Sequence, residues 1–121
     1  MKVPTRRPEE FLPLTPAMLH ILLALADKER HGYHIMREVD ERTGGNVKLG
    51  PGTLYGSIKR MITAGLIEET EERPDPMMDD QRRRYYRLNA KGMRVLQAEA
   101  ERLVRQVELA RLKHVLAGGQ E

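Results

Sequence analysis

The segment from Pro16 to the polar turn that begins at Asp27 constrains the fold most, because the helix that it would form is apolar on most sides. Thr15 and Pro16 suit the N-cap and the first position of that helix. Such a helix must be covered on all sides by other elements. The chain has 121 residues, of which 40% are hydrophobic, and this is enough for one modest core. We therefore expect a single core built around this helix.

Two further helices are predicted after the central one. The first runs from about 32 to 42 and ends at Gly44 and Gly45, and the second runs from about 53 to 64 and ends at Gly65. Both have the apolar spacing of helices that bury one face. For the first of them, the expected core residues are Tyr33, Met36 and Val39.

Two short strands and a long helix complete the predicted order. The strands cover 66–71 and 83–88, and the loop between them is too long for a tight hairpin turn. Asn89 is a suitable N-cap for a helix over 90–117, which would be about 42 Å long. This order of elements is that of a winged helix-turn-helix. The predicted fold class is therefore mainly α with a small β-hairpin.

The predicted organisation has four segments. Residues 1–14 carry prolines among charged residues and are expected to form a flexible N-terminal arm. Residues 15–89 would form a winged helix-turn-helix DNA-binding domain, and 90–117 a C-terminal dimerisation helix. Residues 118–121 would form a short tail.

The helix over 53–64 has a small, basic face opposite its apolar face. In a winged helix-turn-helix this helix enters the DNA major groove, where Lys59 and Arg60 would meet phosphates or guanine edges. A glycine in mid-helix costs about 1 kcal/mol relative to alanine. Gly56 therefore indicates either close approach of another molecule or a tolerated surface glycine. A solvated polar face is the alternative for each residue taken alone. The predicted DNA-binding residues here are Thr53, Tyr55, Gly56, Ser57, Lys59, Arg60 and Thr63.

Arg82, Arg83 and Arg84 form the densest positive charge in the chain, at the base of the second predicted strand. Each arginine that neutralises a phosphate releases counterions, so these three are predicted to bind the DNA backbone. A basic strand edge that prevents aggregation would have the same sequence. The loop between the strands carries three aspartates, which repel phosphate. Contacts between the wing and DNA are therefore expected from its base.

The last predicted helix has an apolar seam with alternating spacings of three and four residues. Such a seam packs along another helix, either within the chain or in a second copy. A second copy would give the two-fold symmetry that palindromic DNA sites match. The predicted dimerisation residues are Met93, Leu96, Ala100, Leu103, Val107 and Ala110.

Composition and charge narrow the classes of function. The 21 basic residues only slightly outnumber the 18 acidic ones, so the balance permits DNA as a partner without requiring it. The absence of cysteine excludes a thiolate nucleophile and a cysteine-based metal site. The histidines are scattered, and His31 with His34 lacks a third metal ligand nearby. We therefore expect no enzymatic activity, no metal and no cofactor.

The longest uncharged run, 11–26, is shorter than the roughly 20 apolar residues that span a bilayer. A cleavable signal peptide is the alternative for this run, but cleavage would remove the most hydrophobic helix. We expect no membrane partner and a cytoplasmic protein.

Three segments of the sequence are distinctive: LTPAMLHILLALADKERHGYHIMREVDER, LGPGTLYGSIKRMITAGLIEE and RRRYYRLNAKG. Together they extend from about Leu14 to Gly92. They resemble the PadR family of transcriptional regulators. The resemblance implies a homodimeric winged-helix protein, usually a repressor, that binds an inverted repeat of double-stranded DNA. It also implies release from DNA by a small, commonly aromatic effector. The family's DNA-contacting positions fall on Thr53, Tyr55, Ser57, Lys59 and Arg60, with the wing at Arg82, Arg83 and Arg84.

Two departures from the family's pattern concern the wing and the effector. The wing loop is acidic, and the chain has no tryptophan to enclose an aromatic ligand. Met18, Met93 and Leu96 are candidates to border an apolar effector pocket, or they are ordinary core residues. Two other functions stay open: a winged-helix module that binds another protein without specific DNA binding, and a ligand sensor or small enzyme in the dimer groove.

Overall fold

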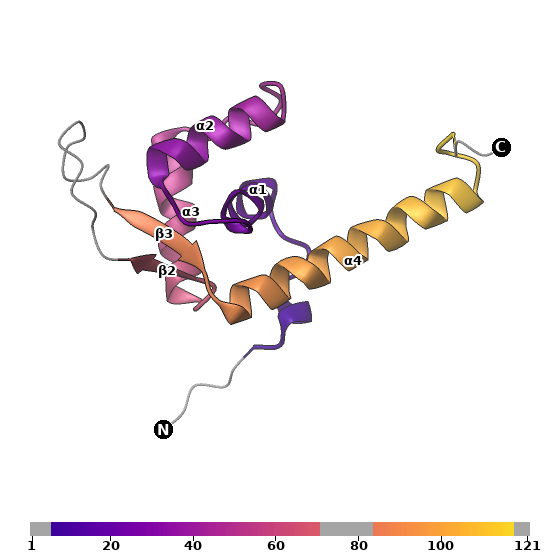
Figure 1. The fold of residues 1–121 in the computed structure, drawn as a ribbon. Coiled ribbons are helices and arrows are strands. Elements are labelled where there is room, and N and C mark those ends of the chain that lie inside the picture. The colour runs from indigo at the N-terminus through magenta and orange to yellow at the C-terminus, as the bar shows by residue number, and fades with distance from the viewer. Residues whose placement is uncertain (1–5, 71–83, 118–121) are drawn as a thin grey trace.

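The computed structural model of the protein describes residues 6–70 and 84–117. Helices dominate this part of the chain, together with a small antiparallel sheet (Figure 1). The elements are the 3-10 helix η1 (Pro8–Phe11), α1 (Pro16–Leu25), β1 (Arg30–His31), α2 (Gly32–Arg42), α3 (Pro51–Thr63), β2 (Ile67–Thr70), β3 (Tyr85–Leu88) and α4 (Ala90–Leu112). The predicted fold class, a winged helix-turn-helix with a long C-terminal helix, is confirmed.

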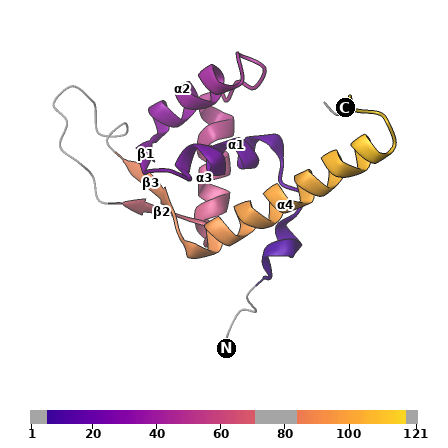
Figure 2. The same cartoon turned by 45° about the vertical axis from the view of Figure 1, so that its right-hand side comes forward.

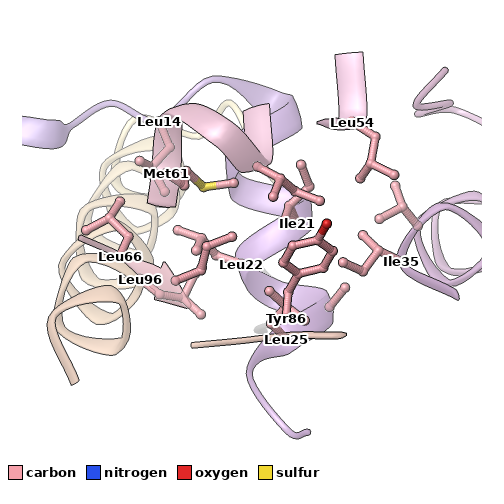
Figure 3. Close-up of a cluster of buried hydrophobic side chains, with 14 of the residues drawn as sticks. Leu14, Ile21, Leu22, Leu25, Ile35, Leu54, Met61, Leu66, Tyr86 and Leu96 are labelled. Carbon is pink, nitrogen blue, oxygen red and sulfur yellow. The ribbon is translucent and has the colours of Figure 1, made fainter. Parts of the chain in front are cut away.

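The core is built around α1, as the sequence predicts. Ile21 and Leu22 of α1 are fully buried. Four elements pack against α1, namely α2, α3, α4 and β3. Figure 3 shows side chains from each of these elements meeting beside α1. Those that face it include Ile35 of α2, Leu54 and Met61 of α3, Tyr86 of β3 and Leu96 of α4.

The helix ends follow the predicted capping residues. The Thr15 hydroxyl accepts a hydrogen bond from the Met18 backbone N–H at 3.1 Å, and the Asn89 side chain accepts one from Gly92 N–H at 2.8 Å. At the C-terminal end of α3, Gly65 has a φ of 82°. This left-handed conformation suits glycine and ends the helix where the sequence predicts.

The sheet has the strand order β1-β3-β2, with both pairs antiparallel. Ile67 lies opposite Leu88 and Thr70 opposite Tyr85, so β2 and β3 form the predicted hairpin. The strand β1 was not predicted, because two residues are too few to show the alternation of polar and apolar residues that marks a strand. It adds Arg30 opposite Tyr86. The outer ends of the predicted strands, at residues 71 and 83, lie outside the described residues.

The expected flexible arm is wrong for its second half. Residues Pro8–Phe11 form η1 beside α4, and Leu14 is buried in the core (Figures 1 and 2). The Leu14 backbone N–H donates a hydrogen bond to the buried Glu99 carboxylate of α4 at 3.1 Å. A buried carboxylate needs such donors, and this one holds the segment in place. Residues 1–5 and the expected tail 118–121 lie outside the described residues.

The long helix and the core face of α2 also differ from expectation in detail. The helix α4 ends at Leu112 rather than at residue 117. Tyr33, expected in the core, is 43% exposed, whereas Ile35 is fully buried. Ile35 and Val39 lie one helical turn apart and set the buried face of α2, which leaves Tyr33 on the opposite side.

Candidate nucleic-acid interface

The helix α3 presents one face to the core and one to solvent. Leu54, Ile58 and Met61 are buried, and α3 packs against α1 and α2. The opposite face is predominantly exposed and carries most of the predicted DNA-binding residues of this helix. Thr53, Tyr55, Lys59, Arg60 and Thr63 are exposed, and Gly56 is half-buried. Their placement agrees with the predicted outward face, and their contact with DNA stays a prediction.

Ser57 does not lie on this outward face. Its side chain is fully buried, and its hydroxyl oxygen lies 3.3 Å from an Arg60 guanidinium nitrogen that donates to it. A serine side chain can be buried between packed elements because it is small and because its hydroxyl oxygen has a hydrogen-bond donor. Ile62, which follows the buried Met61, is 37% exposed. The predicted contact of Ser57 with phosphate is therefore corrected, because the side chain has no exposed surface and its hydroxyl accepts from Arg60.

The Tyr55 ring joins α3 to the first residue of α2. A Cβ atom on Gly32 would lie 2.4 Å from the Tyr55 hydroxyl oxygen and 2.8 Å from two ring carbons. Only a glycine permits this approach without a shift. Tyr55 is thus held beside Gly32 while 37% of it stays exposed. This contact is part of the packing between α2 and α3.

Gly56 has no comparable neighbour within the described chain. A Cβ atom built there would meet only the Arg60 guanidinium, at 3.8 Å, which is an ordinary van der Waals distance. The fold of the described residues therefore does not require glycine at this position.

The described base of the wing carries arginines that are paired with carboxylates. Arg84 Nε lies 3.5 Å from Glu69, and Arg87 Nη2 lies 3.0 Å from Glu68 on the neighbouring strand. All four side chains are largely exposed, so a phosphate could compete with either carboxylate. Arg82 and Arg83, the other predicted wing residues, lie outside the described residues.

His31 caps α2 and is a structural residue. Its Nδ1 accepts a hydrogen bond from the His34 backbone N–H at 3.3 Å, and the two rings stack with centroids 3.8 Å apart. Partial burial, followed by the charge of Arg37, lowers the pKa of His34 below its ordinary value. Within 6–70 and 84–117, no group of three or more histidine, aspartate or glutamate residues could hold a metal ion.

Tyr86 of β3 is buried in the core. Burial, helped by the charge of Glu69, raises the pKa of the Tyr86 phenol. The Tyr86 side chain lies among the apolar side chains of the core (Figure 3).

Sequence reasoning missed Tyr33 as a surface residue near this site. It follows Gly32, on which Tyr55 lies, and is exposed at the start of α2. The four-residue spacing of Ile35 and Val39 is the signal that could have placed Tyr33 on the outside.

The predicted seam of α4 divides into two parts. Leu96 is buried in the chain's own core and Met93 is half-buried, so the chain itself covers the start of the seam. Beyond it, Leu103 and Val107 are exposed, and the helix projects away from the other elements (Figure 2). The remaining seam residues are Ala100, which is exposed, and Ala110, which is half-buried. The predicted role of Leu96 in dimerisation is therefore corrected, because Leu96 packs inside the monomer.

None of the helices in the described ranges is long and apolar enough to cross a lipid bilayer.

Comparison with known proteins assigns the family. Residues 21–98 match the family described as "Transcriptional regulator PadR-like family". The chain belongs to the PadR family. The resemblance to this family that the sequence indicates is thereby confirmed. The matched residues include Gly32 and Tyr55, and the contact described above gives a physical reason for both.

Relatives of this PadR-family chain include a regulator of similar length. It is 35% identical over 100 residues to "Transcriptional regulator Rv3488" of Mycobacterium tuberculosis, covering 83% of this chain and 82% of the relative. The chain spans 23% and 63% of the length of two other curated relatives that it matches.

Solved structures of similar fold include two PadR proteins. A PadR family transcription regulator from Clostridium difficile has a TM-score of 0.64 at 28% identity, covering 81% of this chain and 99% of that one. Bacillus subtilis PadR, solved in complex with operator DNA, has a TM-score of 0.60 at 21% identity, covering 71% and 47%. The second likeness concerns the fold alone.

Proposed function

We propose that this PadR-family regulator is a homodimeric repressor that binds an inverted-repeat operator in double-stranded DNA. The α3 helix of each copy enters the major groove, and the wing base, with Arg82, Arg83 and Arg84, binds the backbone. The observation that carries the proposal is the charge of the α3 outer face. Lys59 and Arg60 are exposed there, and neither forms an ion pair with a carboxylate in the described residues. Both charges are therefore available to DNA.

The exposed part of α4 supports the homodimer. Leu109 is 48% exposed, Leu112 77% and Val104 54%, in addition to Leu103 and Val107 of the seam. Several exposed apolar side chains on one projecting helix are typical of a protein interface. A second copy of the same helix would cover it and give the symmetry of an inverted repeat.

The proposal includes release by a small apolar or aromatic effector. A hollow of about 350 Å³ lies on α4, lined by Ala100, Glu101, Val104 and Arg105. In a dimer the partner helix would close this hollow. Although Glu101 and Arg105 line it, most of its exposed surface is apolar, which favours a molecule of low polarity. Repression and effector release are the properties that the PadR resemblance implies. DNA as the partner also supports the cytoplasm as the site of action.

The first test of the proposal is selection of bound duplexes from a random DNA library near physiological salt. An enriched inverted repeat, with half-sites about one helical turn apart, is the expected result. Affinity for the selected duplex should fall steeply as salt rises, because counterions are released on binding. A folded protein that enriches no sequence, and whose contacts respond little to salt, would instead support the protein-binding module.

The α3 face itself is tested by the double substitution Lys59→Ala with Arg60→Ala. Affinity for the selected duplex should fall by about 100-fold, because two direct contacts are lost, and the thermal unfolding curve should stay unchanged. The matched control is Arg94→Ala with Lys113→Ala, which removes the same charge from exposed positions in α4 and at its C-cap. A double variant at α3 that binds its site as the control does would show that another surface reads the DNA.

A further inference from the structure

The C-terminal end of α3 and the N-terminal end of α4 are joined by a compact set of hydrogen bonds. Three successive carbonyl groups after α3, at Ala64, Gly65 and Leu66, each accept one. Lys91 Nζ lies 3.1 Å from the Ala64 oxygen. Asn89 supplies two donors: its Nδ2 lies 2.7 Å from the Gly65 oxygen and its backbone N–H 3.2 Å from the Leu66 oxygen. We name these contacts the α3–α4 junction.

The chemistry of the junction suits the ends of both helices. The last carbonyls of a helix lack partners within the helix and carry partial negative charge, so an ammonium group is a favourable donor. Lys91 supplies that group to Ala64, which caps α3. Asn89 acts on both helices at once, because its oxygen caps α4 while its nitrogen bonds to Gly65.

Gly92 brings the two helix ends unusually close. A Cβ atom at this position would lie 2.1 Å from the Leu66 oxygen, so any larger residue would push α4 away from α3. The Lys91 ammonium also lies 5.4 Å from the centre of the Phe11 ring in η1. Lys91 thus touches α3 and the N-terminal segment from the first turn of α4. In Figures 1 and 2 the lower end of α3 lies beside the start of α4.

A small change of angle at this junction becomes a large displacement at the far end of α4. The helix from Ala90 to Leu112 is about 34 Å long, so a 10° rotation moves its far end by about 6 Å. Adjacent base pairs are separated by only about 3.4 Å along the DNA axis. In a dimer held together by α4, the angle at the junction therefore determines which separation of half-sites the two α3 helices can reach.

We propose that Lys91 is a positioning residue that sets the half-site spacing accepted by the dimer, acting through the α3–α4 junction. This inference rests on the proposed function, since it needs a dimer held by α4 and bound to two half-sites. Lys91 is the informative residue of the junction, because Asn89 and Gly92 are also needed to begin the helix and to pack it. The half-buried Lys91 side chain adds a charged hydrogen bond between α4 and the C-cap of α3, two helices that form without it.

The test is a spacing series of duplexes built from the half-site that library selection yields. Two half-sites are placed at the selected separation and at separations one and two base pairs shorter or longer, and a single half-site serves as reference. The variant Lys91→Met keeps the length of the stem and removes the ammonium. Its affinity at the selected spacing should fall about fivefold, as for one lost hydrogen bond, while single half-site affinity stays within about twofold of the wild type. The preference over neighbouring spacings should flatten.

Two further variants separate positioning from stability and from charge. Lys91→Arg keeps a donor for the Ala64 oxygen and should restore the wild-type spacing profile. Arg94→Met removes the same charge from an exposed position one turn along α4 and should leave the profile unchanged. Thermal unfolding, measured for each variant, shows whether a change in affinity comes from loss of the fold.

Each outcome decides one of the two proposals. A Lys91→Met variant that keeps the wild-type spacing profile overturns this inference and leaves the proposed function standing. A variant that loses single half-site binding to the same degree also overturns it, because Lys91 would then act on the DNA or on the fold. A wild-type protein that binds no inverted repeat better than a single half-site overturns the proposed function, and this inference with it.

Discussion

At the scale of single residues, Gly56 and Gly32 illustrate two different reasons for a glycine. Gly32 is required by the chain itself, because the Tyr55 ring occupies the space of a side chain. Gly56 lies in the middle of α3, where glycine weakens a helix, yet its surroundings leave room for a Cβ atom. A glycine that the fold does not need, on the face proposed to meet DNA, is best explained by close approach of the partner.

The substitution Gly56→Ala tests this explanation. The free energy of unfolding should rise by about 0.5–1 kcal/mol, because alanine loses less conformational freedom in a helix. Affinity for the selected duplex should fall about tenfold, because the added methyl group would crowd the interface. Chemical denaturation and fluorescence anisotropy measure the two quantities. Opposite changes in stability and affinity are the signature of a position reserved for the partner.

Gly52→Ala is the matched control for this prediction. Gly52 is an exposed residue in the first turn of the same helix, and an added Cβ atom would have nothing within 4 Å. Its DNA affinity should stay within about twofold of the wild type, since the first turn carries no comparable close contact in the proposal. A Gly56→Ala protein that is more stable and still binds DNA normally would mean that Gly56 is a tolerated surface glycine.

At the scale of elements, the buried Glu99 carboxylate ties the N-terminal segment to α4. Arg102 donates to both carboxylate oxygens, at 2.6 and 3.1 Å, and the Leu14 backbone N–H donates at 3.1 Å. The hydrogen bonds from Arg102 are the main reason that the pKa of Glu99 is lowered from its ordinary value of 4.5. The segment before α1 is thus held to α4 by a charged group that must stay ionised.

Glu99→Gln should therefore change both the stability and its dependence on pH. At neutral pH the free energy of unfolding should fall by about 2 kcal/mol, because a charged hydrogen-bonding partner is lost. In the wild type, the contribution of Glu99 is complete above about pH 4.5 and declines as the pH falls through the lowered pKa of the folded state. Urea unfolding between pH 3 and 7 should show a shallower acid decline for the variant. Glu101→Gln, at an exposed neighbouring position, should resemble the wild type; equal behaviour of both variants would refute the role of Glu99.

The same elements show what the sequence can and cannot predict. The bounds of α1, α2 and α3 follow from local signals such as Thr15, Pro16 and Gly65, because capping and glycine chemistry act over one turn. The contact of Leu14 with Glu99 joins residues 85 positions apart, and no local pattern contains it. The strand β1 and the segment η1 depend on partners of this distant kind, and for that reason they were missed.

In the candidate site, the predicted outward face of α3 was largely correct because helical periodicity determines it. Ser57 was misplaced because residues at the boundary between the two faces are assigned by packing rather than by polarity. Its hydroxyl becomes acceptable inside only when Arg60 supplies a donor, and the sequence does not reveal that geometry.

At the scale of the whole molecule, the exposed half of α4 connects oligomeric state to DNA recognition. The first turns of α4 are anchored in the chain's own core through Val95 and Leu96. Beyond Leu103 the helix has apolar side chains and no covering element in the described residues (Figure 1). In the proposed dimer, α4 would link two copies of the chain, because its first half is part of the monomer core and its second half is exposed.

Val107→Glu should dissociate the proposed dimer. The two copies would then no longer bind the two half-sites of the repeat together. Val107 is 40% exposed in the single chain, and a carboxylate placed there would lose its hydration in a dimer interface without gaining a partner. Light scattering should report a monomer at micromolar concentration. Affinity for the inverted repeat should approach that of one half-site, because the second α3 is no longer held at the required distance. Gln106→Glu adds the same charge beside it without removing apolar surface and should remain dimeric. A monomeric wild type, or a Val107→Glu protein that stays dimeric and binds the full repeat, would place the interface elsewhere than on α4.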